Sequence, residues 1–136
     1  FVFPGGALGT PSSGALDNCT VGGKKIGYRN VPLVVRNANY TFTAADAGGG
    51  AIHTSADTAA RTYTIPANAS VPYDVGDAIT LVNQNGAGVI TIAIISDTMR
   101  LAGAGTTGSR TLAANGIATA IKLTSTEWII SGAGLT

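Results

Sequence analysis

The pattern of apolar and polar positions changes near residue 38. From there to the C-terminus, short runs of β-forming residues alternate with turn residues at intervals of about 8 to 12 residues, which is typical of a β-sandwich or barrel. The runs that predict strands are 40–43, 51–54, 61–65, 78–83, 88–95, 99–101, 110–112, 117–123 and 127–131. The pattern therefore predicts an all-β domain, an antiparallel β-sandwich.

Several of these runs place their apolar residues at every second position, so that the side chains share one face of the predicted strand. The same-face sets are Tyr63 with Ile65, then Ile90, Ile92 and Ile94, then Ile117, Thr119, Ile121 and Leu123, and finally Trp128 with Ile130. Helix is scarce. The spacing of Thr43 and Asp46 fits a capping box and predicts one helical turn, which Gly48 and the glycines after it end.

Residues 1–37 have no such period. Turn residues rich in Gly, Pro and Ser separate single apolar side chains, and none of these stretches is long enough to fold alone. We therefore expect an extended N-terminal arm, residues 1–37, followed by one sandwich domain, residues 38–136. The arm needs another surface, and the residues expected to anchor it to a partner are Phe1, Phe3, Leu8 and Leu16.

Charged residues make up 11% of the chain, less than half of the usual quarter. Such a surface suits close contact with other copies of the protein, and it suits a stable free β domain equally well. The eight basic residues are scattered, which argues against a nucleic-acid partner. The most apolar stretch, 88–95, is far shorter than the roughly 20 residues that cross a bilayer, so we expect a soluble chain with no membrane contact.

The residue types of a nucleophilic triad occur at His53, Ser55 and Asp57. On one short strand these side chains would point to the same face in a row, and no oxyanion-hole motif accompanies them. We therefore expect His53, the only histidine, to lie at the surface or in an interface. Because the chain has few titratable groups, the sequence predicts a non-enzymatic protein with no catalytic residues.

Three other features have a conformational explanation. Asp74 and Asp77 precede a strand, where aspartates favour hydrogen bonds to the local backbone. The glycines of 103–108 lack the Gly-Lys-Ser/Thr ending of a phosphate-binding loop and predict a flexible turn. Cys19 is the only cysteine, so neither an intrachain disulfide nor a thiolate metal cluster can form. We expect no metal site and no cofactor.

Two groups of segments carry a resemblance to known proteins. The first is FPGGALGTPSSG at 3–14 with LDNCT at 16–20, and the second comprises NYTFT at 39–43, ARTYTIPAN at 60–68, GDAITLVN at 76–83, GSRTLAANG at 108–116 and WIISGAG at 128–134. The first group resembles the opening of virion proteins of tailed bacteriophages. The second resembles a β module that recurs in phage structural proteins.

A compact chain with one β domain and an arm looks like a capsid cement or decoration protein of jelly-roll type. This resemblance implies that the protein sits on the outer capsid surface of the virion, binds the major capsid protein, and associates with itself as a homodimer or homotrimer. The alternative is a tail-fibre or head-fibre domain that binds a host-surface receptor. Fibre modules usually belong to longer chains, whereas we expect this chain to be complete.

Overall fold

The computed structural model describes residues 20–21, 24–25 and 30–136, and the chain divides into two compact units, residues 1–30 and 31–136. In the first unit, β1 (Thr20–Val21) pairs antiparallel with β2 (Lys24–Lys25). The predicted anchors Phe1, Phe3, Leu8 and Leu16 lie outside the described residues, so their role stays a prediction.

The second unit is a nine-stranded sheet in which β3-β5-β7-β10-β8-β6-β4 are neighbours, and β11 pairs with β10 and β9. The strands are β3 (Leu33–Val35), β4 (Tyr40–Thr41), β5 (Gly49–His53), β6 (Arg61–Ile65), β7 (Ala78–Asn83), β8 (Ile90–Ile94), β9 (Thr98–Leu101), β10 (Arg110–Thr124) and β11 (Glu127–Leu135). The only helical element described is the 3₁₀ turn η1 (Ala44–Asp46). The prediction of an all-β domain is confirmed, and no described helix is long and apolar enough to cross a membrane.

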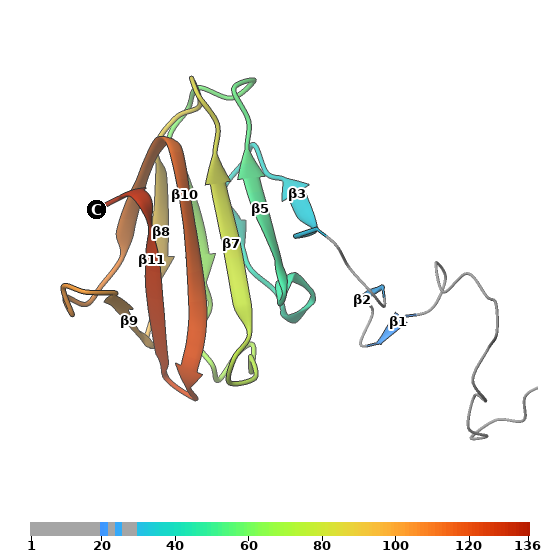
Figure 1. Cartoon of the computed structure of the whole chain (residues 1–136). Coiled ribbons are helices and arrows are strands. Elements are labelled where there is room, and N and C mark those ends of the chain that lie inside the picture. The colour runs from blue at the N-terminus through green and yellow to red at the C-terminus, as the bar shows by residue number, and fades with distance from the viewer. Residues whose placement is uncertain (1–19, 22–23, 26–29) are drawn as a thin grey trace, which may run out of the picture. The chain divides into compact units, whose positions relative to one another are not determined.

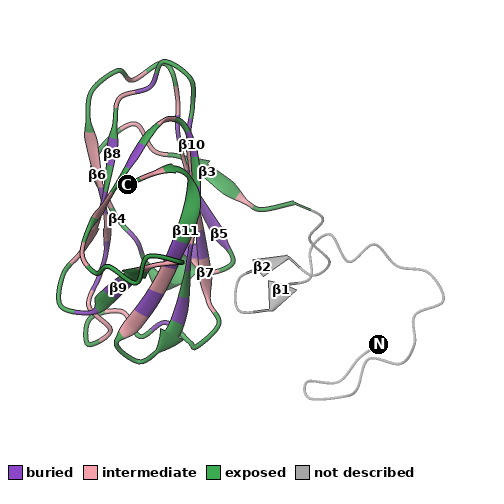
Figure 2. Cartoon of the chain, turned by 60° about the vertical axis from the view of Figure 1, so that its left-hand side comes forward, coloured by how far each residue is buried: buried purple, intermediate pink, exposed green. Residues whose placement is uncertain are grey.

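The long strand β10 bends the sheet back on itself. Its first part, Arg110–Leu112, pairs with β8, whereas Gly116–Ile121 pairs with β7. Between them, Asn115 takes a positive φ of 62°, and a Cβ on Gly116 would lie 2.5 Å from Leu112 Cδ1. The sheet thus forms a half-barrel with a front half (β3, β5, β7, the second part of β10, β11 and β9) and a back half (β4, β6, β8 and the first part of β10). Figure 1 shows the front half, and Figure 2 shows β4, β6 and β8 on the side opposite β3, β5 and β7.

The predicted antiparallel pairing is wrong for most of the sheet. Five of the eight strand pairs in the nine-stranded sheet are parallel, and only the three pairs made by β10 are antiparallel. From β3 to β8 consecutive strands alternate between the two halves, so neighbours within one half are second neighbours along the chain and run in the same direction. A jelly roll is built from antiparallel strands, so that topology is not confirmed.

Most strand positions agree with the sequence pattern, and 61–65 and 78–83 agree at both ends. The predicted runs 110–112 and 117–123 are parts of one strand. The strand β3 was missed, because Leu33–Val35 lies in the stretch assigned to the arm, yet all three residues pair with β5. The sheet therefore begins before the predicted boundary at residue 38.

The core between the two halves is built on aromatic rings. Tyr73 and Trp128 meet edge to face with their centroids 5.2 Å apart, and Phe42 meets Tyr63 in the same way at 6.1 Å. Branched aliphatic side chains from both halves fill the space between them. The predicted same-face pairs Tyr63 with Ile65 and Trp128 with Ile130 are confirmed as buried.

The predicted helical turn is confirmed as η1. The Asp46 carboxylate accepts the Thr43 backbone N–H at 2.7 Å and the Thr43 hydroxyl at 3.0 Å. It also accepts the hydroxyl of Tyr40 at 2.9 Å, so this turn is attached to β4.

Candidate interaction face

The second part of β10 turns its larger apolar side chains toward solvent. Exposure is 51% for Ile117, 39% for Ile121 and 41% for Leu123. The positions facing the core are instead Ala118, Ala120 and Lys122, each at most 1% exposed. The prediction that 117–123 has one apolar side is confirmed, but this side lies outward.

Contacts on all sides hold β10 in this register. Both of its neighbours pair with it, so that Ile117 lies between Val82 of β7 and Ala133 of β11. On the inner side, Lys122 Nζ lies 2.8 Å from Asp97 Oδ2 and 4.9 Å from the centre of the Trp128 ring. A slip of one residue would bury the isoleucines but would expose the alanines and break this ion pair.

The register extends the apolar side of β10 across five strands. One row of paired residues runs Val35, Ile52, Val82, Ile117, Ala133, and a shorter row runs Ala78, Ile121, Ile129. We call the following positions the outer face: Leu33, Val35, Ile52, Ala78, Thr80, Val82, Ile117, Thr119, Ile121, Leu123, Ile129, Ser131 and Ala133. None of them is charged, and the exposed ion pair of Arg100 with Glu127 adjoins this face at β9. Figure 1 views the front half from this side, and Figure 2 shows how much of β3 and β11 is exposed.

This face is comparable in area to the largest apolar patch on a typical free protein. Five strands and seven residues of β10 span about 20 Å by 20 Å, or roughly 400 Å² before side-chain relief is counted. The largest apolar patch of a typical monomer covers about 300 to 600 Å², and such a patch often marks a contact with a protein or ligand. The arrangement is chemically suited to flat contact with an uncharged protein surface.

The outer side of the back half has a different character. Thr62 of β6 pairs with Thr91 of β8, which pairs with Thr111 of β10, and Thr41 of β4 pairs with Thr64 of β6. The buried partners in these strands, such as Tyr63 and Ile92, point to the core, so the threonines face outward. We call these five residues the threonine face. It presents rows of hydroxyl groups rather than apolar side chains.

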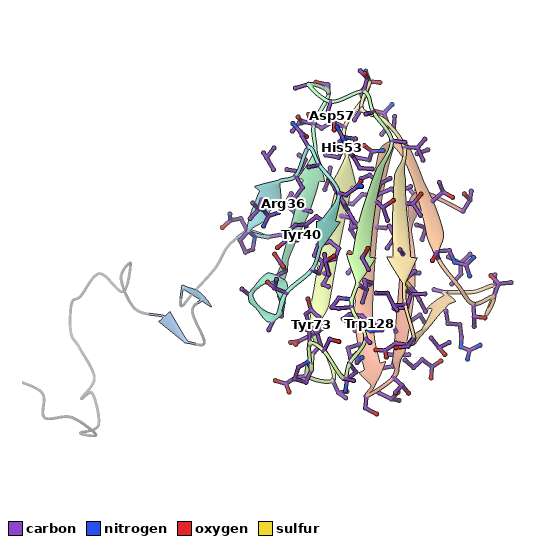
Figure 3. All side chains as sticks on the ribbon, turned by 180° about the vertical axis from the view of Figure 1, so that it is seen from behind. Arg36, Tyr40, His53, Asp57, Tyr73 and Trp128 are labelled. Carbon is purple, nitrogen blue, oxygen red and sulfur yellow. The ribbon has the colours of Figure 1, made fainter. Side chains whose placement is uncertain are left out.

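Two of the three residue types of a nucleophilic triad, His53 and Asp57, belong to a polar network at one end of the half-barrel. His53 is fully buried, and its Nε2 lies 3.0 Å from Asp57 Oδ2. Its Nδ1 lies 3.2 Å from both Asn83 Oδ1 and the Gly88 carbonyl oxygen. Arg61 donates to both oxygens of Asp57, at 2.6 Å from Nε and 3.1 Å from a terminal nitrogen. Figure 3 shows His53 and Asp57 at the end opposite Tyr73 and Trp128.

Two predictions about these residues are wrong. His53 lies in the interior rather than at the surface, because β5 ends at this residue and the following turn returns Asp57 to its ring. Ser55 does not continue the strand. It is exposed in that turn, where its backbone N–H donates to Gln84 Oε1 at 3.1 Å. The contacts found at both His53 ring nitrogens come from Asp57, Asn83 and Gly88, which fits a role in joining β5 to β7 and to the chain before β8.

The network predicts a specific response to acid. The hydrogen bonds from Arg61, and to a lesser extent that from His53, hold the pKa of Asp57 well below its ordinary value. A carboxylate with a lowered pKa stabilises the fold above its unfolded pKa of about 4, and this contribution is lost as pH falls below that value. We expect wild type to exceed Asp57→Asn in free energy of unfolding at pH 7, and the difference to shrink at pH 3. Urea unfolding at both pH values measures this, and an equal difference at both would contradict it.

The remaining sequence features behave as local structure. The Asp74 backbone N–H donates to Asp77 Oδ2 at 2.9 Å, and the Asp77 N–H donates to the Asp74 carbonyl at 3.0 Å, so the predicted turn is confirmed. Gly103, Gly105 and Gly108 all take positive φ in the loop between β9 and β10. Within the described part of the chain, no three His, Cys, Asp or Glu side chains are grouped so as to hold a metal ion.

The outer face is thus the feature best suited to a function, and the sequence signals for it were the low charge and the isoleucine alternation of 117–123. The predicted anchors in the arm cannot be compared with it, since they lie outside the described residues. No protein-family model, curated protein or solved structure matches the chain.

Proposed function

We propose that this chain is a non-enzymatic structural protein of a bacteriophage particle, a cement protein that binds the outside of the major capsid protein shell and stabilises it. The observation that carries the proposal is the burial pattern of β10. This strand exposes Ile117 and Ile121 while it buries Lys122, and the two isoleucines belong to an apolar patch of a size that often marks a contact. Covering the outer face with another protein would remove these side chains from water.

The proposed mechanism is binding alone and involves no catalysed reaction. Each copy would lay its outer face on the shell, and the threonine face would remain toward solvent. The arm would reach a second capsid subunit, so that two contacts held by one chain strengthen one another. Because the outer face carries no charge, we expect its binding to depend only weakly on salt concentration. Many copies in symmetric positions would then oppose expansion of the shell.

The threonine face favours a second candidate, the tail-fibre or head-fibre domain. Its hydroxyl groups both donate and accept hydrogen bonds, as a host-surface receptor rich in hydroxyl or amide groups requires. In that arrangement the outer faces of the copies would pack together inside the fibre. Deleting residues 1–20 separates the candidates, because it removes shell binding by a cement protein and leaves receptor binding by a distal domain intact.

The proposal is tested on particles that lack the protein. We expect such particles to release their DNA at a lower temperature, and added wild-type protein to restore the release temperature. An Ile117→Thr/Ile121→Thr variant keeps β-forming residues but removes the apolar contact, so it should restore little. The matched control is Thr62→Val/Thr91→Val on the threonine face, which should restore as well as wild type.

Unchanged release temperatures in particles lacking the protein would contradict the cement role. Blocking of phage adsorption to cells by the isolated protein would favour the fibre alternative.

A further inference from the structure

The sheet has three margins, at β3, β9 and β4, and two of them offer little to a partner. The margin of β9 is covered by the following loop, since the Leu101 N–H donates to the Thr106 carbonyl at 2.8 Å and the Gly108 N–H donates to the Met99 carbonyl at 3.0 Å. The strand β4 has two residues. The margin at β3 is the remaining one, where no described strand pairs with the side away from β5, and Figure 1 shows it at the side of the front half.

The hydrogen bonds between β3 and β5 show which backbone groups of β3 face outward. The Pro32 carbonyl accepts the Gly50 N–H at 3.2 Å, and the Arg36 N–H donates to the Ile52 carbonyl at 2.9 Å. Alternate residues of a strand direct their N–H and C=O to opposite sides. The groups of Leu33 and Val35 therefore point away from β5, and Pro32 lies at a position where its missing N–H does not weaken the free margin.

The side chains at this margin lack the usual protection against pairing. Natural edge strands carry charges, proline or bulges that prevent association. In β3 all three side chains are apolar and exposed, with Val34 at 45%, and Val31 just before it is also exposed. The residue directly after β3 is the charged Arg36, and its guanidinium stacks 3.8 Å above the Tyr40 ring.

We propose that β3 pairs antiparallel with β3 of a second copy of this chain, about a twofold axis at Val34. Leu33 of each copy would then face Val35 of the other, with about four backbone hydrogen bonds between them. This inference rests on the proposed function, because it names the self-association that accompanies shell binding. The pairing itself does not require the shell.

The pairing also explains why the outer face extends to the margin. Leu33 and Val35 belong to the outer face, and the row that contains Val35 continues through Ile52 to Val82. A twofold axis at Val34 places the same row of the second copy beside it, so the two outer faces form one apolar surface. A three-residue pairing is small, so we expect a weak and transient dimer in solution, which a cross-link can trap.

A cross-link at Val34 tests the pairing. Residues opposite each other at a site without mutual hydrogen bonds have Cα atoms about 4.5 Å apart, which falls within the range of a disulfide. In a Cys19→Ser background, Val34→Cys should form a disulfide-linked dimer on mild oxidation, at least tenfold faster than Val75→Cys. Val75 is the control because it is more exposed, at 69%, and lies far from β3 in the chain.

A second pair of variants separates backbone pairing from contact of side chains. Val35→Pro removes an N–H that points to the free margin while leaving the bonds to β5, so it should abolish the cross-link of Val34→Cys. Val35→Thr keeps the N–H and should retain it. Circular dichroism establishes that each variant is folded.

Equal cross-linking at Val34→Cys and Val75→Cys, or none at either, would overturn the inference. Neither result affects the release temperatures of the particles, so failure of the pairing and failure of the cement role are distinguishable.

Discussion

Replacing Lys122 with methionine should lower the free energy of unfolding by about 3 to 5 kcal/mol, the cost of removing one partner of a buried ion pair. The Lys122 side chain is fully buried and that of Asp97 is 4% exposed, with 2.8 Å between Nζ and Oδ2. Methionine fills much of the same volume, but it leaves the Asp97 carboxylate without its cation. Urea unfolding of the full chain at pH 7 measures the difference.

The matched control is the double variant Lys122→Met/Asp97→Asn. The asparagine oxygen can still accept the Asn68 backbone N–H that Asp97 accepts at 3.2 Å, and no unpaired charge remains in the core. We expect this variant to recover at least half of the lost free energy, because an apolar or neutral pair often replaces a buried ion pair without loss. A Lys122→Met variant as stable as wild type would contradict the inward placement of Lys122.

Replacing Trp128 with alanine should cost about 3 to 5 kcal/mol, the usual range for removing a large buried ring. Trp128 is fully buried, and its ring packs against Tyr73 on one side and lies under the Lys122 ammonium. The change therefore removes contacts with both an aromatic ring and a cation. Chemical denaturation of wild type and variant measures the loss.

Phenylalanine at the same position should cost much less. Trp128 Nε1 is buried and has no hydrogen-bond partner among the described residues, so its removal gives up no hydrogen bond that the structure shows, and we expect the smaller ring still to meet Tyr73 and Lys122. A Trp128→Phe variant as unstable as Trp128→Ala would indicate that the indole N–H has a partner after all.

The sequence predicted the strands well because their alternation is local. The run 61–65 alternates threonine with apolar residues, and its buried face follows directly from that pattern. The same reasoning could not choose the buried face of β10. The choice depends on Asp97, which lies 25 residues from Lys122, and on the small inner side chains that leave room for the Trp128 ring.

The parallel pairing of the strands also could not be predicted from the sequence pattern. Strands spaced at 8 to 12 residues can form antiparallel hairpins, or they can cross from one half of a half-barrel to the other. The residues between the strands are compatible with both connections. The network at His53 was missed for a related reason. Its residue types were noticed, but two partners of the His53 ring, Asn83 and the Gly88 carbonyl, lie 30 and 35 residues away, and no local pattern connects them to it.

We propose that another protein covers the outer face when this chain is bound to a phage particle. Carbene footprinting with mass spectrometry compares side-chain labelling of the free protein with that of the same protein on particles. We predict that labelling of 117–123 falls at least fivefold on the particle, while labelling of Thr62 and Thr91 stays unchanged. Unchanged labelling of 117–123, with protection of the threonine face instead, would contradict the claim.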